Sequence, residues 1–513
     1  MKNSKIWILP GLLTIVILAA VLVVFGGLEG EVGEDASVLS QEISQNSANI
    51  RKSAVAGSFY PEDKEELVSN LSFYLENAKS VEVGGKLRIL IAPHAGLNYS
   101  GNTAAWGFKQ LEEKKYSRVI ILGASHSTRF DHVAVYDKGT WETPLGDVAI
   151  DEDYAGSLID NVNFIADTKN HKEEHSLEME LIFLQKVLDD FTIVPILVSN
   201  PTDELVSVLA QKIAYNFDEN TLLVVSSDLS HYPDYETAKL VDRKVVEAVV
   251  ANNLGDYEKT VSEIESGNYP NLSTAACGHQ AIRVAIKVAE ILGIHDIKEI
   301  KYENSGDVTD DRNRVVGYAS IGGWSSNLQF KTPELDEIAQ KEALAIARTT
   351  LMGQIQSQSI PPATPSSTIL YEPLGAFVTL EKHDNLRGCM GLFEPDTPLY
   401  EVIQRQTIVA ATQDPRFSPV VETELDDINI EISVMTPRRK IDNWKEIEVG
   451  KHGVVIEKGQ SRGTFLPQVA TDNEWGLEKF LSVLCSQKIK LEADCYKDTD
   501  VNIYTFEAQV FEE

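Results

Sequence analysis

The chain has 513 residues, which at roughly 150 residues per domain suggests two or three domains. Hydrophobic residues make up 43% and charged residues 24%, an ordinary globular composition that excludes disorder over most of the chain. The net charge of −32 argues against nonspecific binding to nucleic acid or to anionic lipid surfaces, because both need an excess of Lys and Arg.

The N-terminal segment predicts a membrane anchor. Lys2 and Lys5 precede an uncharged, mostly apolar run at 6–28, long enough to cross a hydrocarbon core of about 30 Å as one helix. Gly26 and Gly27 make a poor cleavage site, so we favour a retained anchor over a signal segment. The lysines should stay in the cytoplasm, with the remaining domains on the extracytoplasmic side. We assign 1–28 to the anchor or signal segment and 29–49, which is polar and small, to a flexible stalk.

Residues 50–325 predict an α/β domain, because short apolar strands alternate with helices. Such alternation is typical of a largely parallel sheet. Leu67, Leu71 and Leu75 mark the apolar side of the first helix, and Ser176 is the expected N-cap of another. The expected strands are 87–92, 119–122, 193–198 and 222–225, and the other expected helices are 177–188 and 280–292.

Residues 326–513 predict a smaller α+β domain, in which strands and helices do not alternate regularly. A helix at about 335–352 leads into a linker with three prolines, 361, 362 and 365. The expected strands are 375–380, 428–433, 453–456 and 501–506, and further helices are expected at 400–412 and 476–486.

Polar residues follow three predicted strands of the first domain. His94, His126, Asp228 and His231 come directly after them, and ligands of open α/β sheets bind beyond the carboxyl ends of strands. Imidazole and carboxylate groups from several strand ends suit a divalent transition metal. A single histidine in such a place is usually a structural residue, but three in equivalent positions favour a metal site. His175, before a predicted helix, can reach the same edge.

The four cysteines are too few and too scattered for a disulfide framework. Cys485 and Cys495 are close enough in sequence to pair, but the sequence favours free thiols. Cys277 lies just before a predicted helix, where the thiolate is favoured, so it is either a soft metal ligand or a nucleophile. The alternative is a small buried hydrophobic residue.

Six segments between about 50 and 324 resemble, in order, the motifs of the Memo family. They are AGSFYP at 56–61, PHAG at 93–96, GASH at 123–126, EHSLE at 174–178, SSDLSH at 226–231 and CG at 277–278.

The Memo family is similar in fold to the class III extradiol dioxygenases, so the resemblance implies a dioxygenase-like α/β domain with a non-heme iron or copper site. It implies His94, His126 and Cys277 as metal ligands, with Asp228, His231 and His175 lining the site. A thiolate in place of a carboxylate ligand means that ring cleavage does not carry over.

The second domain contains NLRGCMG at 385–391, in which Cys389 lies between two glycines and near Arg387, a setting typical of a reactive thiol. This motif resembles the hallmark of the AMMECR family, as do DPRF at 414–417, His452 before a glycine, and GTFLPQV at 463–469. We list Cys389 as a candidate catalytic residue that shares a site with Arg387 and His452. Alternatively, the glycines and Arg387 only fix a turn and a strand edge.

Memo-like and AMMECR-like domains, together with a radical SAM protein, form the AmmeMemoRadiSam set, and this chain resembles a fusion of two of its components. The resemblance implies a radical SAM protein as partner. No CxxxCxxC motif occurs, so the chain binds no radical SAM cluster itself. We expect a membrane-tethered, metal-dependent oxidoreductase acting on an unidentified small molecule or peptide. The alternative is a non-catalytic scaffold protein. It would bind a partner through a degenerate dioxygenase-like cleft and through the AMMECR-like surface.

Overall fold

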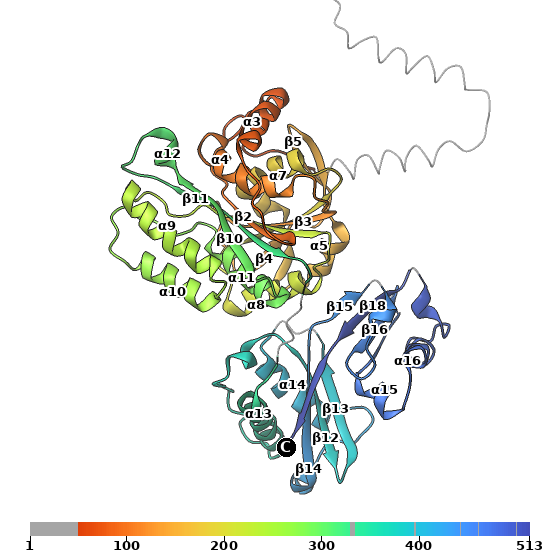
Figure 1. Ribbon diagram of the computed structural model, residues 1–513. Coiled ribbons are helices and arrows are strands. Elements are labelled where there is room, and N and C mark those ends of the chain that lie inside the picture. The colour runs from red at the N-terminus through yellow and green to blue at the C-terminus, as the bar shows by residue number, and fades with distance from the viewer. Residues whose placement is uncertain (1–49, 329–333, 394–396, 442, 460, 499) are drawn as a thin grey trace, which may run out of the picture. The chain divides into compact units, whose positions relative to one another are not determined.

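The structure, a computed structural model, describes residues 50–328, 334–393, 397–441, 443–459, 461–498 and 500–513 (Figure 1). The predicted anchor and stalk lie outside the described residues. Within the described part of the chain, no helix is both long enough and apolar enough to cross a bilayer.

The first domain is built on an eight-stranded sheet in the order β10-β11-β2-β9-β3-β8-β4-β7. Its centre is parallel and consists of β2 (Lys86–Ala92), β9 (Thr221–Ser226), β3 (Arg118–Ala124) and β8 (Thr192–Val198). Nearly every residue of these strands is buried, as expected for strands covered on both faces. All four predicted strands are therefore confirmed.

The edges of this sheet are antiparallel, so it is parallel only at its centre. On one side β11 (Gly317–Ser325) runs antiparallel to β2, and β10 (Asp296–Asn304) runs antiparallel to β11. On the other side β4 (Val133–Val135) is antiparallel to β8, while β7 (Phe164–Ala166) is parallel to β4.

Helices form a layer on each face of the sheet (Figure 1). One layer holds α3 (Lys64–Asn77), α4 (Leu97–Phe108) and α7 (Ser176–Val187), and Leu67, Leu71 and Leu75 of α3 are buried as predicted. The prediction for Ser176 is wrong by one residue, since His175 is the N-cap and Ser176 is the first helical residue. The other layer holds α8 (Asp203–Tyr215), α9 (Tyr235–Val250), α10 (Leu254–Glu265) and α11 (His279–Leu292).

Short elements complete this domain. They are β1 (Ile50–Arg51), η2 (Lys109–Leu111), β5 (Thr140–Thr143), β6 (Gly146–Ala149), α5 (Glu152–Leu158), α6 (Thr168–His171) and α12 (Ser305–Thr309).

The second domain has two four-stranded antiparallel sheets, each with its own apolar core. The first runs β13-β12-β14-β19, and α13 and α14 pack against it. The second runs β15-β18-β16-β17, and α16 leads into a π-helical turn, η6, that packs against β17. All the strands and helices predicted here are confirmed within a few residues.

The bounds in the first half of this domain are α13 (Glu337–Ile355), η3 (Thr368–Tyr371), β12 (Gly375–Lys382), β13 (Asn385–Leu392), α14 (Leu399–Thr412), η4 (Glu422–Asp427) and β14 (Ile428–Met435). The later elements are β15 (Arg439–Ile441), η5 (Trp444–Glu446), β16 (Gly453–Lys458), β17 (Ser461–Phe465), α15 (Gln468–Asp472), α16 (Leu477–Val483), η6 (Leu484–Ile489), η7 (Cys495–Lys497), β18 (Asn502–Phe506) and β19 (Ala508–Glu512).

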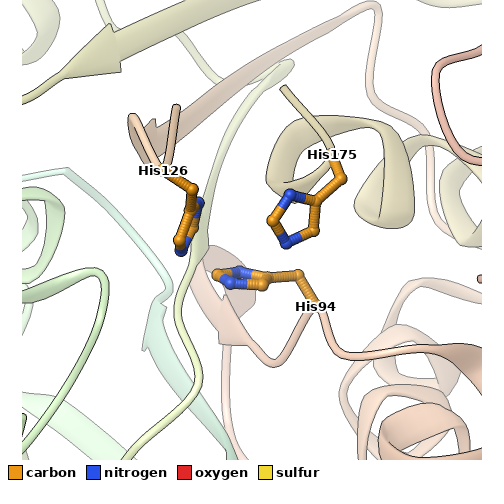
Figure 2. A group of neighbouring side chains, drawn as sticks. All are labelled: His94, His126 and His175. Atoms are coloured by element: carbon orange, nitrogen blue, oxygen red, sulfur yellow. The ribbon is translucent and has the colours of Figure 1, made fainter. Parts of the chain in front are cut away.

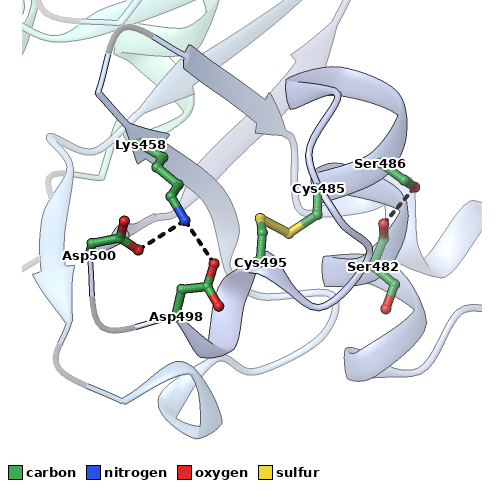
Figure 3. The surroundings of a disulfide bond; sticks show 7 residues. All are labelled: Lys458, Ser482, Cys485, Ser486, Cys495, Asp498 and Asp500. Carbon is green, nitrogen blue, oxygen red and sulfur yellow. Dashed lines mark hydrogen bonds and ion pairs between the residues drawn. A yellow bond between two sulfur atoms is a disulfide. The ribbon is translucent and has the colours of Figure 1, made fainter.

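A disulfide joins Cys485 to Cys495 in the second core (Figure 3). The expectation of free thiols is wrong here, because the turn of η6 brings the two Cα atoms to 5.9 Å, a separation that a disulfide spans easily. Next to it, Lys458 pairs with both Asp498 and Asp500. Both sulfurs are buried, so the bond stabilises this core rather than facing solvent.

Candidate functional site

Three neighbouring parallel strands place one side chain each at the same edge of the sheet. His94, His126 and Asp228 each lie two residues beyond the end of their strand, β2, β3 and β9 respectively. Because these strands are parallel neighbours, their carboxyl ends lie together, as the sequence predicted.

Three histidines converge at this edge. The ligand nitrogens of His94, His126 and His175 all lie within 4.8 Å of one another, and Figure 2 shows the three rings facing a common centre. The ring centroids are 5.0 Å apart for His94 and His126, 5.4 Å for His94 and His175, and 4.7 Å for His126 and His175. Among the described residues, this is the group of histidine, cysteine or acidic side chains that can hold a metal ion.

Hydrogen bonds at Nδ1 leave the same ring nitrogen of His94 and His126, Nε2, turned to the centre. His94 Nδ1 lies 2.8 Å from Ser226 Oγ, and His126 Nδ1 lies 2.9 Å from Glu174 Oε1. Their Nε2 atoms can then bind a metal ion. Metal-binding histidines usually bind the metal with one ring nitrogen and hydrogen-bond with the other.

Glu174 organises one side of this centre. Besides the His126 ring, its carboxylate accepts hydrogen bonds from the backbone amides of His126 (2.7 Å), His175 (3.1 Å) and Ser176 (3.0 Å). These contacts and the charge of His126 hold the pKa of Glu174 far below its usual range, although burial opposes them. Our sequence analysis missed this role, and the one signal for it was the place of Glu174 beside His175.

Arg51 holds the segment that carries Glu174 and His175. Its buried guanidinium donates to the carbonyl oxygens of His171 (2.7 Å) and Glu174 (2.5 Å) and pairs with Glu178 at 2.5 Å. It also lies 4.1 Å from the ring centroid of Trp141. One side chain thus fixes both the loop before α7 and the first turn of that helix.

The protonation of the histidines suits a metal. Burial, together with the neighbouring histidines, holds the pKa of His94 well below its usual value, and burial also lowers the pKa of His175. For His126, burial is outweighed by Glu174, which raises the pKa. His94 and His175 are therefore neutral imidazoles at neutral pH, the form that binds metals.

Cys277 lies beside the histidines but outside the group of three. Its Sγ is 3.3 Å from His94 Nε2 and accepts a hydrogen bond from the Asp228 amide at 3.2 Å. A metal with ordinary bond lengths of roughly 2.1 Å to nitrogen and 2.3 Å to sulfur separates two such ligands by about 3.6 Å. The spacing to His94 is therefore compatible with a shared ion, and the assignment of Cys277 as a ligand stays a prediction.

The expectation of a favoured thiolate at Cys277 is wrong for the metal-free protein. Withdrawal from water and the nearby Asp228 carboxylate raise the pKa of the thiol far above its usual value, and together they outweigh the helix that follows.

The Asp228 carboxylate hydrogen-bonds to backbone amides and not to a histidine ring. Its Oδ1 accepts hydrogen bonds from the amides of His94 at 2.9 Å and Ala95 at 3.3 Å, so it fixes the backbone that carries the His94 ring. Burial raises the pKa of Asp228 to about 6, against the opposing effect of His231. His231 Nδ1 lies 2.9 Å from the Leu229 carbonyl and so carries a proton, which leaves Nε2 as the basic nitrogen.

The centre opens on one side. The His94 ring is buried, whereas 30% of the His126 side chain is exposed. Phe59 lies against His175 with 5.0 Å between ring centroids. A small molecule would therefore approach from the side of His126.

The motif around Cys389 forms a strand edge. Cys389 lies on β13, an edge strand, and its amide donates to Asp414 Oδ2 at 2.9 Å while its carbonyl accepts from Arg416 at 3.1 Å. The Asp414–Arg416 pair thus satisfies the backbone groups that a further strand would otherwise bind. The Sγ atom itself accepts a weak hydrogen bond from Thr379 at 3.4 Å.

The neighbours of Cys389 also have structural roles. Arg387 pairs with Glu424 at 2.9 Å and donates to the Ser418 carbonyl. A side chain at Gly388 would meet the carbonyl oxygen of Ala410 on α14. Within the described residues His452 contacts Glu448 and Glu507, so the site shared with Arg387 and Cys389 stays a prediction.

Two family models match this chain in tandem. The model described as Memo-like protein matches residues 51–322, more than half of the chain, and the AMMECR1 model matches residues 344–511. The chain belongs to the Memo-like protein family. Its second domain is an AMMECR1 domain, so the two resemblances seen in the sequence are confirmed.

Individual relatives match the Memo-like domain over almost their whole length. A MEMO1 family protein of Methanobrevibacter smithii is 35% identical over 285 residues, which cover 53% of this chain and 98% of that protein. A MEMO1 family protein of Thermotoga neapolitana is 34% identical with the same coverage. The crystal structure of an uncharacterized protein from Pyrococcus horikoshii aligns at 35% identity over 35% of this chain and 93% of the other, with a TM-score of 0.33.

Proposed function

We propose that the Memo-like domain binds one divalent transition metal, iron or copper, through His94, His126 and His175, with Cys277 as a further ligand, and acts as a metal-dependent oxidoreductase. The observation that carries this proposal is the convergence of three histidine nitrogens at one sheet edge. Imidazole and thiolate are donors that iron, copper and zinc prefer, whereas magnesium and calcium prefer oxygen.

A bound iron or copper would supply redox chemistry, and a substrate would reach it from the exposed side of His126. The residues of the chain would do the rest. Glu174 and Asp228 hold the ligand histidines in place, through the His126 ring and the His94 backbone respectively. His231, whose basic nitrogen is Nε2, would take up or deliver a proton.

Elemental analysis of the full chain, purified in detergent, tests the proposal. We expect about one iron or copper per chain in the wild type and in the control His295→Ala, since His295 is exposed and distant in sequence from the motifs. His126→Ala should lose the metal. The same trace of metal in all three proteins would contradict a metal-dependent function and leave the scaffold alternative.

Cys277→Ser tests the fourth ligand separately. If the sulfur binds, Cu²⁺ added to the wild type gives a thiolate-to-metal charge-transfer absorption that the serine variant lacks. An identical spectrum in both would restrict the ligands to the three histidines.

We further propose that residues 6–28 anchor the chain and that both domains lie on the extracytoplasmic side. The uncharged run supports the anchor, and the Cys485–Cys495 disulfide supports an oxidising compartment. External protease should digest the AMMECR1 domain in intact protoplasts that express the full chain. Digestion only after lysis would contradict the proposed side.

A radical SAM protein remains the proposed partner, on the resemblance to the AmmeMemoRadiSam set alone. Such a partner must share a compartment with this chain, so the protease experiment bears on it too. Co-purification of the full chain with that protein from the source cells is the direct test. Clean separation of the two under mild detergent would count against a stable complex.

A further inference from the structure

A buried hydroxyl and a buried carboxyl lie behind His94, and the proposed function uses neither. Ser226 is the last residue of β9 and Glu180 lies in α7, and both are fully buried. Ser226 Oγ lies 2.8 Å from His94 Nδ1, 2.7 Å from Glu180 Oε1 and 2.9 Å from the carbonyl oxygen of Ser176.

A single arrangement of protons makes all three contacts hydrogen bonds at once. A serine hydroxyl has one proton to donate and two lone pairs that accept. The Ser176 carbonyl can only accept, so it takes the Ser226 proton. His94 Nδ1 and Glu180 must then both donate to Ser226, which requires a proton on His94 Nδ1 and a neutral carboxylic acid at Glu180.

Three further observations agree with this assignment. Burial raises the pKa of Glu180 well above its usual value, and its Oε2 has no hydrogen-bond partner among the described residues. An ionised carboxylate with one such oxygen would be strongly unfavourable. On the opposite side of the ring, the Cys277 sulfur lies 3.3 Å from His94 Nε2, so the thiol can donate to this nitrogen when Nδ1 carries the ring proton.

We propose that Ser226 and Glu180 are positioning residues that hold His94 with its proton on Nδ1, and so keep the Nε2 lone pair directed to the metal centre. The inference rests on the proposed metal site. It adds that the two ligand histidines are held by different groups. The Nδ1 atom of His126 contacts the Glu174 carboxylate, whereas that of His94 contacts a hydroxyl that is itself bonded to a neutral acid.

Ser226→Ala removes the acceptor for the His94 proton. In Co²⁺ titrations of the full chain in detergent, followed by visible absorption, we expect binding about 10- to 100-fold weaker than in the wild type, with a shifted Co²⁺ spectrum. The matched control is Ser320→Ala, which also deletes a fully buried hydroxyl of this domain, but one bonded to the Thr103 carbonyl. Equal affinity and equal spectra in the two variants would overturn the proposal.

Glu180→Gln and Glu180→Met form a second pair that does not depend on Ser226→Ala folding. The glutamine amide can donate to Ser226 as the neutral acid does, so Glu180→Gln should keep both the Co²⁺ affinity and its dependence on pH. Glu180→Met cannot donate and should bind several-fold more weakly. A large loss in Glu180→Gln would show that the native group is an ionised carboxylate, contrary to the proposal.

¹⁵N NMR of histidine-labelled full chain, without metal, separates this inference from the proposed function. The His94 signals are assigned as those that disappear in His94→Ala. In the wild type they should show the ring proton on Nδ1, and in Ser226→Ala the proton should shift toward Nε2. If the wild type fails to bind Co²⁺ but shows this tautomer, the metal function fails and the positioning role stands. If His94 carries its proton on Nε2 in the wild type, the positioning role fails.

Discussion

Cys277 and Cys389 look alike in the sequence and differ in their surroundings. Each is a free cysteine beside a glycine, one in each domain. Around Cys277, a strand end and two loops bring His94 and Asp228 to the sulfur. Around Cys389, the close contacts are to its backbone, from Asp414 and Arg416, and the sulfur meets only a threonine hydroxyl.

The comparison teaches that a glycine beside a cysteine does not by itself mark chemistry. In the Memo-like domain, a histidine ring and a backbone amide from distant parts of the chain contact the sulfur. In the AMMECR1 domain, the cysteine lies on an edge strand whose backbone groups bind Asp414 and Arg416. The neighbouring Gly388 leaves room for the Ala410 carbonyl of α14. The contacts around Cys389 therefore favour the structural alternative, in which the glycines and Arg387 only fix a turn and a strand edge.

The two glycines give the sharpest test of this contrast. A Cβ at Gly278 would lie 2.5 Å from Ser227 Cβ, and one at Gly388 would lie 2.4 Å from the Ala410 oxygen. We expect Gly278→Ala and Gly388→Ala each to lower the free energy of unfolding of its domain by about 3 kcal/mol, measured by urea denaturation. Only Gly278→Ala should also weaken metal binding. Metal loss in Gly388→Ala would show that the motifs are coupled.

The stability of the Memo-like domain should depend on pH, because it contains a buried carboxyl group. Asp242 accepts hydrogen bonds from the Ser230 amide and the Tyr302 hydroxyl, and burial raises its pKa to about 6. A raised folded-state pKa means that this group's contribution to stability is present at pH 4 and is lost as the pH rises to 6. The stability of Asp242→Asn relative to the wild type should therefore increase over that range by up to about 3 kcal/mol. A difference that does not change with pH would contradict the shift.

The disulfide should stabilise only the AMMECR1 domain. Cys485 and Cys495 are 10 residues apart, so the loop-closure estimate for the bond is about 2.7 kcal/mol. The double variant Cys485→Ala/Cys495→Ala should lower the melting temperature of that domain in calorimetry and leave the Memo-like transition in place. Added reductant should have the same effect on the wild type and none on the double variant.

The smallest effect is expected for Cys389 itself. Its structural contacts are made by its backbone, so Cys389→Ser should change the free energy of unfolding by less than about 1 kcal/mol and leave metal content unchanged. Cys277→Ser, its counterpart, should reduce metal affinity. Loss of a measurable activity in Cys389→Ser would revive this residue as a nucleophile.

The sequence was sufficient for the strands and for the edge at which the site lies. Apolar runs locate β2, β3, β9 and β8, and the residues just beyond their ends are the ones that meet, because parallel neighbouring strands end together. His94 and His126 were found in this way.

What the sequence could not show depends on contacts between distant segments. Glu174 supports His126 from 48 residues away, and its place beside His175 does not show which distant ring it contacts. The pKa of Cys277 depends on Asp228, a residue 49 positions earlier that periodicity cannot place against it. The pairing of Cys485 with Cys495 likewise follows from the π-helical turn, which has no recognisable sequence signal.

Arg51 has a practical consequence for anyone trimming the protein. It lies at the start of the described residues, yet its guanidinium holds the loop that carries Glu174 and His175. A shortened version that begins at residue 52 would lose this guanidinium and the support that it gives to the segment before α7. Soluble versions intended for crystals or metal assays should therefore start several residues upstream of Arg51, so that β1 remains intact.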